Sequence, residues 1–537
     1  MPQNKALPRW KRAGVRVLKA AALLLLIATQ CPTQAQTLRI ALKAAVDNAD
    51  PAQLYTPNRN VHLQVYEPLI RQDEHAQRLP GLALTWRPLA PLTWEIKLRP
   101  GVTFSDGTPF TAQDVIFTIN RIQVSEGVRT YRIYTRDIAA MDAPDPQTLI
   151  IHTPTPAAGL PVNLAAFGIV SAKAAKDATS DDWNGGRAAI GTGSLRWIKY
   201  TPGQSVILER NPAWWGGPIP WTHVEYRFVP NDSARVAALL AGDVDVIDTV
   251  PPNLFERLRT GDKTQLVTTT SSFTLYLQLD QFRDVSPFVT LPDGSHGPPN
   301  PLRDRRVRRA ISLALNRTAI SGSAMEDGAV PAAQFVPDGF EGHDPTLTPV
   351  RPDPAQSRRL LAEAGFEKGF GLTIHCTNDR YVGDAKVCQT VAQMLNAVGI
   401  RAAVDTLPAA IFFRRAGTPT AEPEFSAQMS IYSNLVGVGI ENMNSVVHTV
   451  DPAIGLGAAN RSRYSSKPLD EALARAAATF DETTRRTLVL EATRMAIADE
   501  AATPIFHMKA TWGLRRGLKL SPRGDQYTNA TDVTPTQ

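Results

Sequence analysis

The stretch "TWEIKLRPGVTFSDGTPFTAQDVIFTINR", Thr93 to Arg121, carries the local signals from which the fold can be read. Asp106-Gly107 is a turn dipeptide, and Pro109 punctuates the loop that follows it. Thr111-Ala112-Gln113-Asp114 is a capping box in front of the apolar "VIFTI" and predicts a helix. Ser105 has no histidine near it in sequence and no oxyanion motif, so we interpret the stretch as a turn and a helix start, not as a reactive loop.

The length and the charge of the chain exclude some classes of protein. A chain of 537 residues is too long for one compact core and predicts two to four structural units. Of its 57 basic residues, six lie within residues 1–35, which contain no acid, and the rest equal the 51 acidic residues in number. A balanced charge gives no reason to expect a nucleic-acid partner, which would need a basic face.

Residues 1–35 have the pattern of an export signal. A basic segment precedes "AAALLLLIA", Ala20 to Ala28, and small residues precede Gln36. Nine apolar residues are too few to cross about 30 Å of hydrocarbon as a helix, so the pattern predicts a signal peptide that is cleaved after Ala35. The alternative is a lipoprotein acylated at Cys31, but Gln30 is larger than the small residue that such a site normally has.

The chain has few signs of catalytic or metal chemistry. No G-x-S-x-G, H-E-x-x-H, P-loop or C-x-x-C motif is present, and the nine histidines are scattered. We therefore predict no catalytic residue, no metal site and no cofactor. The other two cysteines, Cys376 and Cys388, belong to one expected strand–loop–helix unit, where a disulfide and a pair of buried thiols both remain open.

Several segments follow an α/β order. In "RVAALLAGDVDVID" (235–248) an amphipathic helix ends at Gly242 and a strand follows. The segments "GFGLTIHC", "DAKVCQTVAQMLNAVGI" and "RAAVDTL" predict a strand, a helix and a strand. The run "RDRRVRR", Arg303 to Arg309, opens another helix, whose apolar stripe leaves the arginines on the opposite face, which we expect to be solvated.

An ordered set of motifs along most of the chain resembles one family. The set consists of "VYEPLIRQDEHAQRLPGLALTW", the Thr93–Arg121 stretch, "IGTGSLRW", "LERNPAWWGG", "RVAALLAGDVDVID", "DRRVRRAISLALNR" and "LLAEAGFEKGFGLTI". From Leu38 to Tyr527 the chain is thereby similar to the family 5 extracellular solute-binding proteins of ABC importers, the dipeptide-, oligopeptide-, glutathione- and nickel-binding group.

The resemblance implies an α/β, two-lobed periplasmic binding protein fold, with a hinge and an extra subdomain inserted in the first lobe. We expect the first lobe at 36–268 with its insertion at about 82–185, the second lobe at 269–503, and a return to the first lobe at 504–537. The two hinge crossings are expected near Thr268–Ser272 and Thr503–Lys509.

The resemblance also implies a function. The expected protein is a monomeric, periplasmic substrate-binding component that captures a small solute, a peptide or a peptide-like molecule, between its lobes. Its partners would be the permease and ATPase subunits of an ABC importer in the inner membrane. A periplasmic hydrolase and a peptide chaperone or chemoreceptor-coupled binding protein are the alternatives.

The expected ligand contacts come from loops that follow strands. Peptide-binding relatives often carry an aspartate-rich loop for the peptide amine, whereas this chain has "FSAQMSIYSNLVGVGIENMNSVVHT" (425–449), with Ile431 near the usual tryptophan position and Glu441 as its only acid. Arg380 is expected to pair with a ligand carboxylate or, alternatively, with Asp379 or Asp384. The candidate residues are Tyr276, Asn378, Arg380, Tyr381, Tyr432, Asn434, Glu441 and Asn442.

Overall fold

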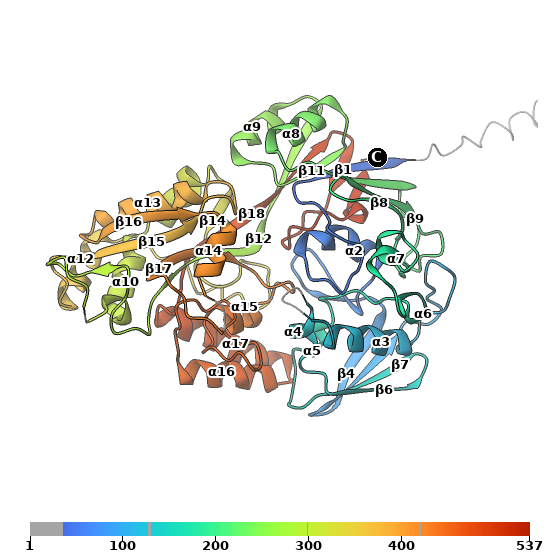
Figure 1. Cartoon of the computed structure of the whole chain (residues 1–537), viewed down its shortest axis with the longest axis horizontal. Helices are drawn as coiled ribbons and strands as arrows, with labels where there is room; N and C mark the ends of the chain where they lie inside the picture. Colours follow the sequence, from blue (N-terminus) through green and yellow to red (C-terminus); the bar gives the residue numbers. More distant parts are fainter. Residues whose placement is uncertain (1–35, 127–129, 298, 418–419, 537) are drawn as a thin grey trace, which may run out of the picture.

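A computed structural model describes residues 36–126, 130–297, 299–417 and 420–536, and it has two lobes (Figure 1). The predicted signal peptide and Cys31 lie outside the described residues. Among the residues described, no helix combines the length and the apolar character that crossing a membrane requires.

One twelve-stranded sheet runs through both lobes. Its strands follow the order β13-β15-β17-β12-β18-β11-β1-β10-β9-β8, and β14 and β16 pair beside this path with β18 and β15. On the first-lobe side lie β1 (Thr37–Leu42), β8 (Leu195–Thr201), β9 (Ser205–Arg210), β10 (His223–Phe228) and β11 (Val246–Asp248). On the second-lobe side lie β13 (Val289–Thr290), β14 (Ala329–Pro331), β15 (Gly371–Thr377), β16 (Arg401–Leu407) and β17 (Ala427–Tyr432).

Two long strands join the lobes. β12 (Thr264–Leu279) and β18 (Thr503–Arg515) pair antiparallel, and they include both segments expected at the hinge. One end of this pair lies beside β11 and the other end beside β17. The register of the pair shifts between Thr270 and Thr274, which interrupts the ladder near the middle of the connection.

A separate four-stranded antiparallel sheet lies below the first lobe in Figure 1. It has the order β4 (Ala83–Ala90), β5 (Thr93–Leu98), β7 (Thr148–His152) and β6 (Ala140–Asp145), and α3 (Ala112–Gln123) packs on it. The backbone N–H of Thr111 donates to the Asp114 carboxylate at 2.9 Å, as the predicted capping box requires. The helix predicted from the opening stretch is therefore confirmed.

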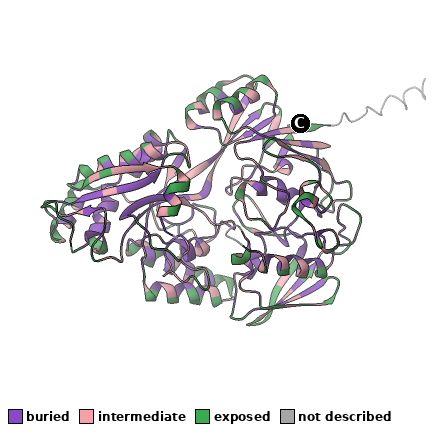
Figure 2. Cartoon of the chain, viewed as in Figure 1, coloured by how far each residue is buried: buried purple, intermediate pink, exposed green. Residues whose placement is uncertain are grey.

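The remaining helices cover the sheets. In the first-lobe half of the chain these are α2 (Arg59–Val65), α4 (Arg132–Thr135), α5 (Leu160–Asn163), α6 (Ala172–Ala175), α7 (Ser180–Asn184), α8 (Asp232–Ala241) and α9 (Phe255–Thr260). The second lobe has α10 (Arg305–Ala314), α11 (Arg317–Ala319), α12 (Pro354–Glu363), α13 (Asp384–Asn396), α14 (Ala409–Arg415), α15 (Gly439–Val446), α16 (Lys467–Ala478) and α17 (Glu482–Ala498). Figure 2 shows that most strands of the twelve-stranded sheet are buried or intermediate, whereas α16 and α17 expose their outer faces.

The α/β order expected from the sequence is present. α8 ends at Gly242, whose φ of 83° is the left-handed conformation that glycine adopts at helix ends. In the second lobe β15, α13 and β16 form a parallel strand–helix–strand unit. The prediction that the arginines of α10 lie on a solvated face is wrong for Arg308. That side chain is buried and donates to the carbonyls of Leu302, Arg303, Asp499 and Glu500.

Candidate functional site

Two adjoining cavities lie between the lobes, beside the strands that join them. The first, here called the hinge cavity, has a volume of about 300 Å³ and is lined by β18 residues 508–512 together with Thr56, Asp248, Arg380 and Tyr381. The second, the loop cavity, has a volume of about 220 Å³ and is lined by residues 431–435 and Arg461. Six residues line both cavities: Thr56, Phe273, Arg380, Ile431, Asp525 and Tyr527.

The first-lobe wall of the cavities is fixed by internal contacts. Arg523 donates to the Asp525 carboxylate through Nε at 3.1 Å and through Nη2 at 2.6 Å, and the Tyr527 backbone N–H donates to the same carboxylate. The Arg59 guanidinium lies 5.1 Å from the centre of the Tyr527 ring. This wall therefore presents a neutralised carboxylate and an aromatic ring to the cleft.

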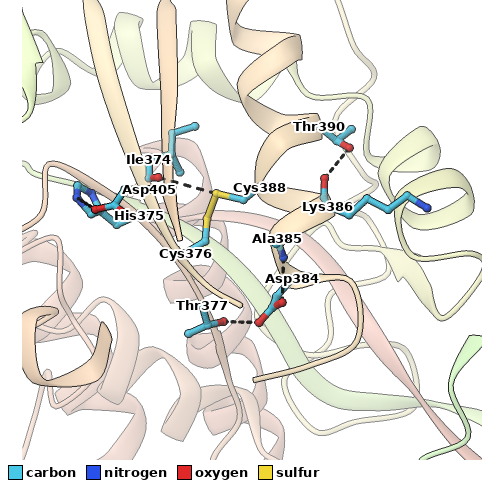
Figure 3. The surroundings of a disulfide bond; sticks show 10 residues. All are labelled: Ile374, His375, Cys376, Thr377, Asp384, Ala385, Lys386, Cys388, Thr390 and Asp405. Carbon is cyan, nitrogen blue, oxygen red and sulfur yellow. Dashed lines mark hydrogen bonds and ion pairs between the residues drawn. A yellow bond between two sulfur atoms is a disulfide. The ribbon is translucent and has the colours of Figure 1, made fainter. Parts of the chain in front are cut away.

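The loop between β15 and α13 carries Arg380 and Tyr381 into the cleft. A disulfide joins Cys376 on β15 to Cys388 on α13, which decides the alternative left open by the sequence in favour of the bond. Thr377 Oγ1 and the Arg380 backbone N–H both donate to the Asp384 carboxylate, at 2.8 and 3.0 Å. Figure 3 shows the disulfide and the Thr377–Asp384 bond at the base of the loop.

Arg380 does not form the ion pair with Asp379 or Asp384 that the sequence left open as an alternative. Asp379 accepts from the Ala409 backbone N–H, and Asp384 is occupied by the bonds within its loop. Among the described residues the Arg380 guanidinium has no ion-pair partner. It is exposed in a cavity wall and is free to meet a ligand.

The other expected contacts fall into two groups. Tyr381 lines the hinge cavity, and Tyr432 and Asn434 line the loop cavity. Asn434 Nδ2 donates to the Val438 carbonyl and to Asn442 Oδ1, so this amide holds the shape of its own loop. Burial raises the pKa of the Tyr432 hydroxyl, which stays protonated and neutral.

Four expected residues lie away from these two cavities. Tyr276 is fully buried, stacks on Phe335 and donates to the Phe335 carbonyl, and the fully buried Asn442 donates to the same carbonyl. Asn378 is exposed and lines neither cavity. Glu441 lines a third cavity of about 440 Å³, whose lining includes no residue of β12 or β18, and burial raises the pKa of its carboxyl group.

Sequence reasoning missed Arg461 and Lys509. Arg461 lines the loop cavity, and its guanidinium lies 5.2 Å from the centre of the Phe413 ring. Lys509 lines the hinge cavity and closes the β18 segment that was expected at the hinge, so its place in the chain was a usable signal. Arg461 follows the glycine-rich "GLGAAN", and nothing in that pattern indicates a cleft.

The lobes also touch on the side away from β12 and β18. Gln72 Nε2 donates to the Val436 carbonyl at 2.7 Å, and Arg485 Nη1 donates to the Ala158 carbonyl at 3.0 Å. The Arg136 Nη1 atom donates to the Ile454 carbonyl at 2.8 Å. These contacts join the lobes at points outside β12 and β18. In the described part of the chain, no group of three or more His, Cys, Asp or Glu side chains is arranged to hold a metal ion.

Comparisons with known proteins agree with this architecture. The family model "Bacterial extracellular solute-binding proteins, family 5 Middle" matches residues 78–448. The chain is 26% identical over 527 residues to di/tripeptide-binding protein 2 of Pseudomonas aeruginosa, covering 92% of each. It is 25% identical over 354 residues to the periplasmic murein peptide-binding protein MppA of Escherichia coli, covering 60% of this chain and 62% of MppA. The match therefore spans less than two thirds of that relative.

A solved structure has the same fold. The ABC transporter substrate-binding protein CtaP of Listeria monocytogenes superposes with a TM-score of 0.80 at 19% sequence identity, over 94% of this chain and 99% of CtaP. The two-lobed α/β fold expected from the sequence is thereby confirmed.

Proposed function

This chain belongs to the family 5 bacterial extracellular solute-binding proteins, and we propose that it is the substrate-binding component of an ABC importer that captures a small solute between its lobes. The observation that carries the proposal is the pair of adjoining cavities, of about 300 and 220 Å³, enclosed by both lobes beside β12 and β18. Such concave, partly apolar sites between lobes suit a small ligand.

The proposed mechanism is a hinge movement that the ligand biases. Tyr527 of the first lobe and Arg380 of the second lobe line both cavities, so a ligand there can contact both lobes at once. A ligand that contacts both walls binds the closed state more tightly and shifts the population toward it. The interrupted register between Thr270 and Thr274 is the point where β12 and β18 would bend.

The proposed ligand is a peptide-like or other small solute. Two relatives are named for binding di/tripeptides and murein peptides, and their names supply the class to be tested first. We propose Arg380, Tyr381, Tyr432 and Asn434 as the ligand-contacting residues among those expected from the sequence, with Tyr276 and Asn442 supporting the wall from behind.

The proposed partners follow from this role. The protein would deliver its ligand as a periplasmic monomer to the permease of an ABC importer, which an ATPase powers. It would release the ligand chemically unchanged. Deletion of the gene should then abolish uptake of the ligand by intact cells.

Ligand binding is tested first with the protein purified from a periplasmic extract, unfolded in denaturant to remove any bound solute, dialysed and refolded. Peptides, glutathione, opines and nickel chelates are then screened by thermal shift. A ligand at about 100 times its dissociation constant should stabilise the protein by roughly 2.7 kcal/mol. Turnover of a bound ester or peptide, without such stabilisation, would contradict the proposal.

A pair of variants locates the binding event. Ile431 lines both cavities, so Ile431→Trp should fill the cleft and abolish the thermal shift. Ile198 on β8 is 50% exposed and lines neither cavity, so Ile198→Trp is the matched control and should bind normally. Normal binding by Ile431→Trp would place the ligand elsewhere.

A further inference from the structure

We infer that the cleft selects an anionic solute, whose carboxylate or other negatively charged group lies against Arg461 and Arg380 in the loop cavity. This inference rests on the proposed function and names the class of its ligand. It departs from the binding of a free peptide amine by a carboxylate, for which the cleft has no unoccupied group.

Arg461 is the strongest observation. Its Nε atom is buried without a hydrogen-bond partner, and its guanidinium has no ion pair with any described residue. Phe413 covers one face of the group at 5.2 Å. Burial lowers the pKa of Arg461 to about 10, so it remains charged at neutral pH.

Arg461 as a whole is half-buried, but a charged group with a buried, unpartnered Nε is unfavourable for folding, and proteins normally pair it. The donors of Arg461 line the loop cavity. An anionic ligand group would satisfy these donors in a setting where little water competes, and charge-assisted bonds of this kind are among the stronger hydrogen bonds. The planar guanidinium can also hold a carboxylate through two parallel bonds.

Two further cations line the cleft without an ion pair, one exposed (Arg380) and one half-buried (Lys509). Arg380 lines both cavities, and Lys509 lines the hinge cavity. Neither side chain forms an ion pair with another residue of the described chain. The remaining lining cation, Lys43, is paired with Asp232 at 3.2 Å.

The carboxylates of the cleft are already neutralised. Asp525 accepts two bonds from Arg523, with Nη2 at 2.6 Å. Asp248 lies 3.6 Å from Arg235 Nε and accepts the Lys43 backbone N–H. The cleft therefore has three unpaired positive charges and no unpaired negative charge, and a ligand of net negative charge balances it.

The shape of the two cavities indicates how such a ligand lies. The loop cavity is the smaller and holds Arg461, whereas the hinge cavity is larger and holds Lys509. Phe273, Ile431 and Tyr527 line the region that both share. The ligand accordingly has an anionic end at Arg461, an apolar or aromatic-contacting middle, and a body that extends toward Lys509.

The test uses a small-molecule extract as its probe. Peptone and plant extract are separated by ion exchange at pH 7 into anionic, neutral and cationic fractions. Each fraction, desalted to equal ionic strength, is added to the refolded protein in a thermal-shift assay. Stabilisation by the anionic fraction alone is the expected result.

Two variants then separate direct contact from the general charge of the surface. Arg461→Gln removes the half-buried guanidinium of the loop cavity, and Arg414→Gln removes an exposed one from α14 that lines neither cavity. The active compound should bind Arg461→Gln roughly 10- to 100-fold more weakly and Arg414→Gln as tightly as the wild type.

A structural role of Arg461 predicts a different result. If this arginine held the fold together, Arg461→Gln would lower the unfolding midpoint of the ligand-free protein. We expect an unchanged or higher midpoint, because the variant removes an unpaired, half-buried charge.

The outcomes distinguish this inference from the proposed function. Stabilisation by the neutral or cationic fraction alone, or equal loss of affinity in both variants, would overturn the anionic class and leave solute binding intact. No stabilisation by any fraction would overturn both. Stabilisation by the anionic fraction that Arg461→Gln removes and Arg414→Gln preserves supports the inference.

Discussion

Two arginines in different parts of the molecule show how a buried charge used for folding differs from a half-buried one available for binding. The side chain of Arg235 in α8 is fully buried, and each nitrogen donates, to the carbonyls of Val229, Pro230, Asp248 and Thr249 and to the Asp232 carboxylate. Arg461 lines the loop cavity with a buried, unpartnered Nε. The guanidinium of Arg235 has hydrogen-bond partners for all its nitrogens without a ligand, whereas that of Arg461 does not.

Removing each arginine tests this contrast most strongly. Arg235→Met leaves several buried carbonyls without their donor and the Asp232 carboxylate with Lys43 alone, and should lower the free energy of unfolding by about 3–5 kcal/mol. Arg461→Met makes the same chemical change at an unpartnered arginine and should leave stability unchanged or raised. Urea unfolding followed by circular dichroism measures both, and equal losses in the two variants would remove the distinction.

A disulfide fixes the loop that forms the second-lobe wall of the cleft, whereas the first-lobe wall is held by noncovalent contacts. The bond closes a short loop, with a sequence separation of 12, at the base of the segment that carries Arg380. The double variant Cys376→Ser, Cys388→Ser should lower the free energy of unfolding by about 3 kcal/mol, since the unfolded chain is no longer constrained.

Reductant provides the control for that variant. Dithiothreitol should destabilise the wild type to the level of the double variant and should not affect the variant itself. Two free thiols in the denatured, unreduced wild type would show that the bond does not form.

A change of pH separates stability from binding in another way. Burial lowers the pKa of His507 to about 3, against about 6.5 in an unfolded chain, so its neutral form belongs to the folded state. Its contribution is present above pH 6.5 and is lost as the pH falls toward 3. Between pH 7 and pH 5 the stability advantage of the wild type over His507→Asn should fall by about 2 kcal/mol.

The cleft arginine should not follow this trend. Arg461 has a pKa of about 10 and keeps its charge at both pH values. The affinity of wild type for a strongly acidic ligand should therefore change little between pH 7 and pH 5, while stability decreases.

The control for His507→Asn is His296→Asn, because His296 is exposed. A stability difference for His507→Asn that is constant with pH would contradict the buried, neutral histidine.

The same contrast explains how far the sequence could predict the molecule. Local signals identified the helix after Thr111, the end of α8 at Gly242 and the β15–α13–β16 unit, because turns, caps and apolar periodicity act over a few residues. The ordered motifs indicated the family, and the family model agrees.

The cleft was less predictable, because its walls come from segments far apart in the chain. Arg308 and Arg461 are both arginines beside ordinary loop or helix signals, yet one is bonded to four carbonyls and the other lines a cavity. Tyr276 lies in a strand where alternation did not distinguish core from cleft, and it is fully buried. Which polar group lacks a partner is a property of the tertiary structure alone.

The smallest expected effect concerns Arg380, which stands between the two extremes. It lines both cavities without an ion-pair partner, like Arg461, but it is exposed, so water and salt compete for its donors. Arg380→Gln should weaken the binding of an anionic ligand about five-fold, the scale of an exposed ion pair of about 1 kcal/mol. Arg380→Lys keeps the charge and should recover most of the affinity. Titration calorimetry at low and high salt should show the difference between wild type and Arg380→Gln shrinking with salt, while the effect of Arg461→Gln is reduced less because that group is less exposed to solvent ions. If salt removed both effects equally, burial would not distinguish the two arginines, and the anionic group of the ligand would lie at the mouth of the cleft instead of in the loop cavity.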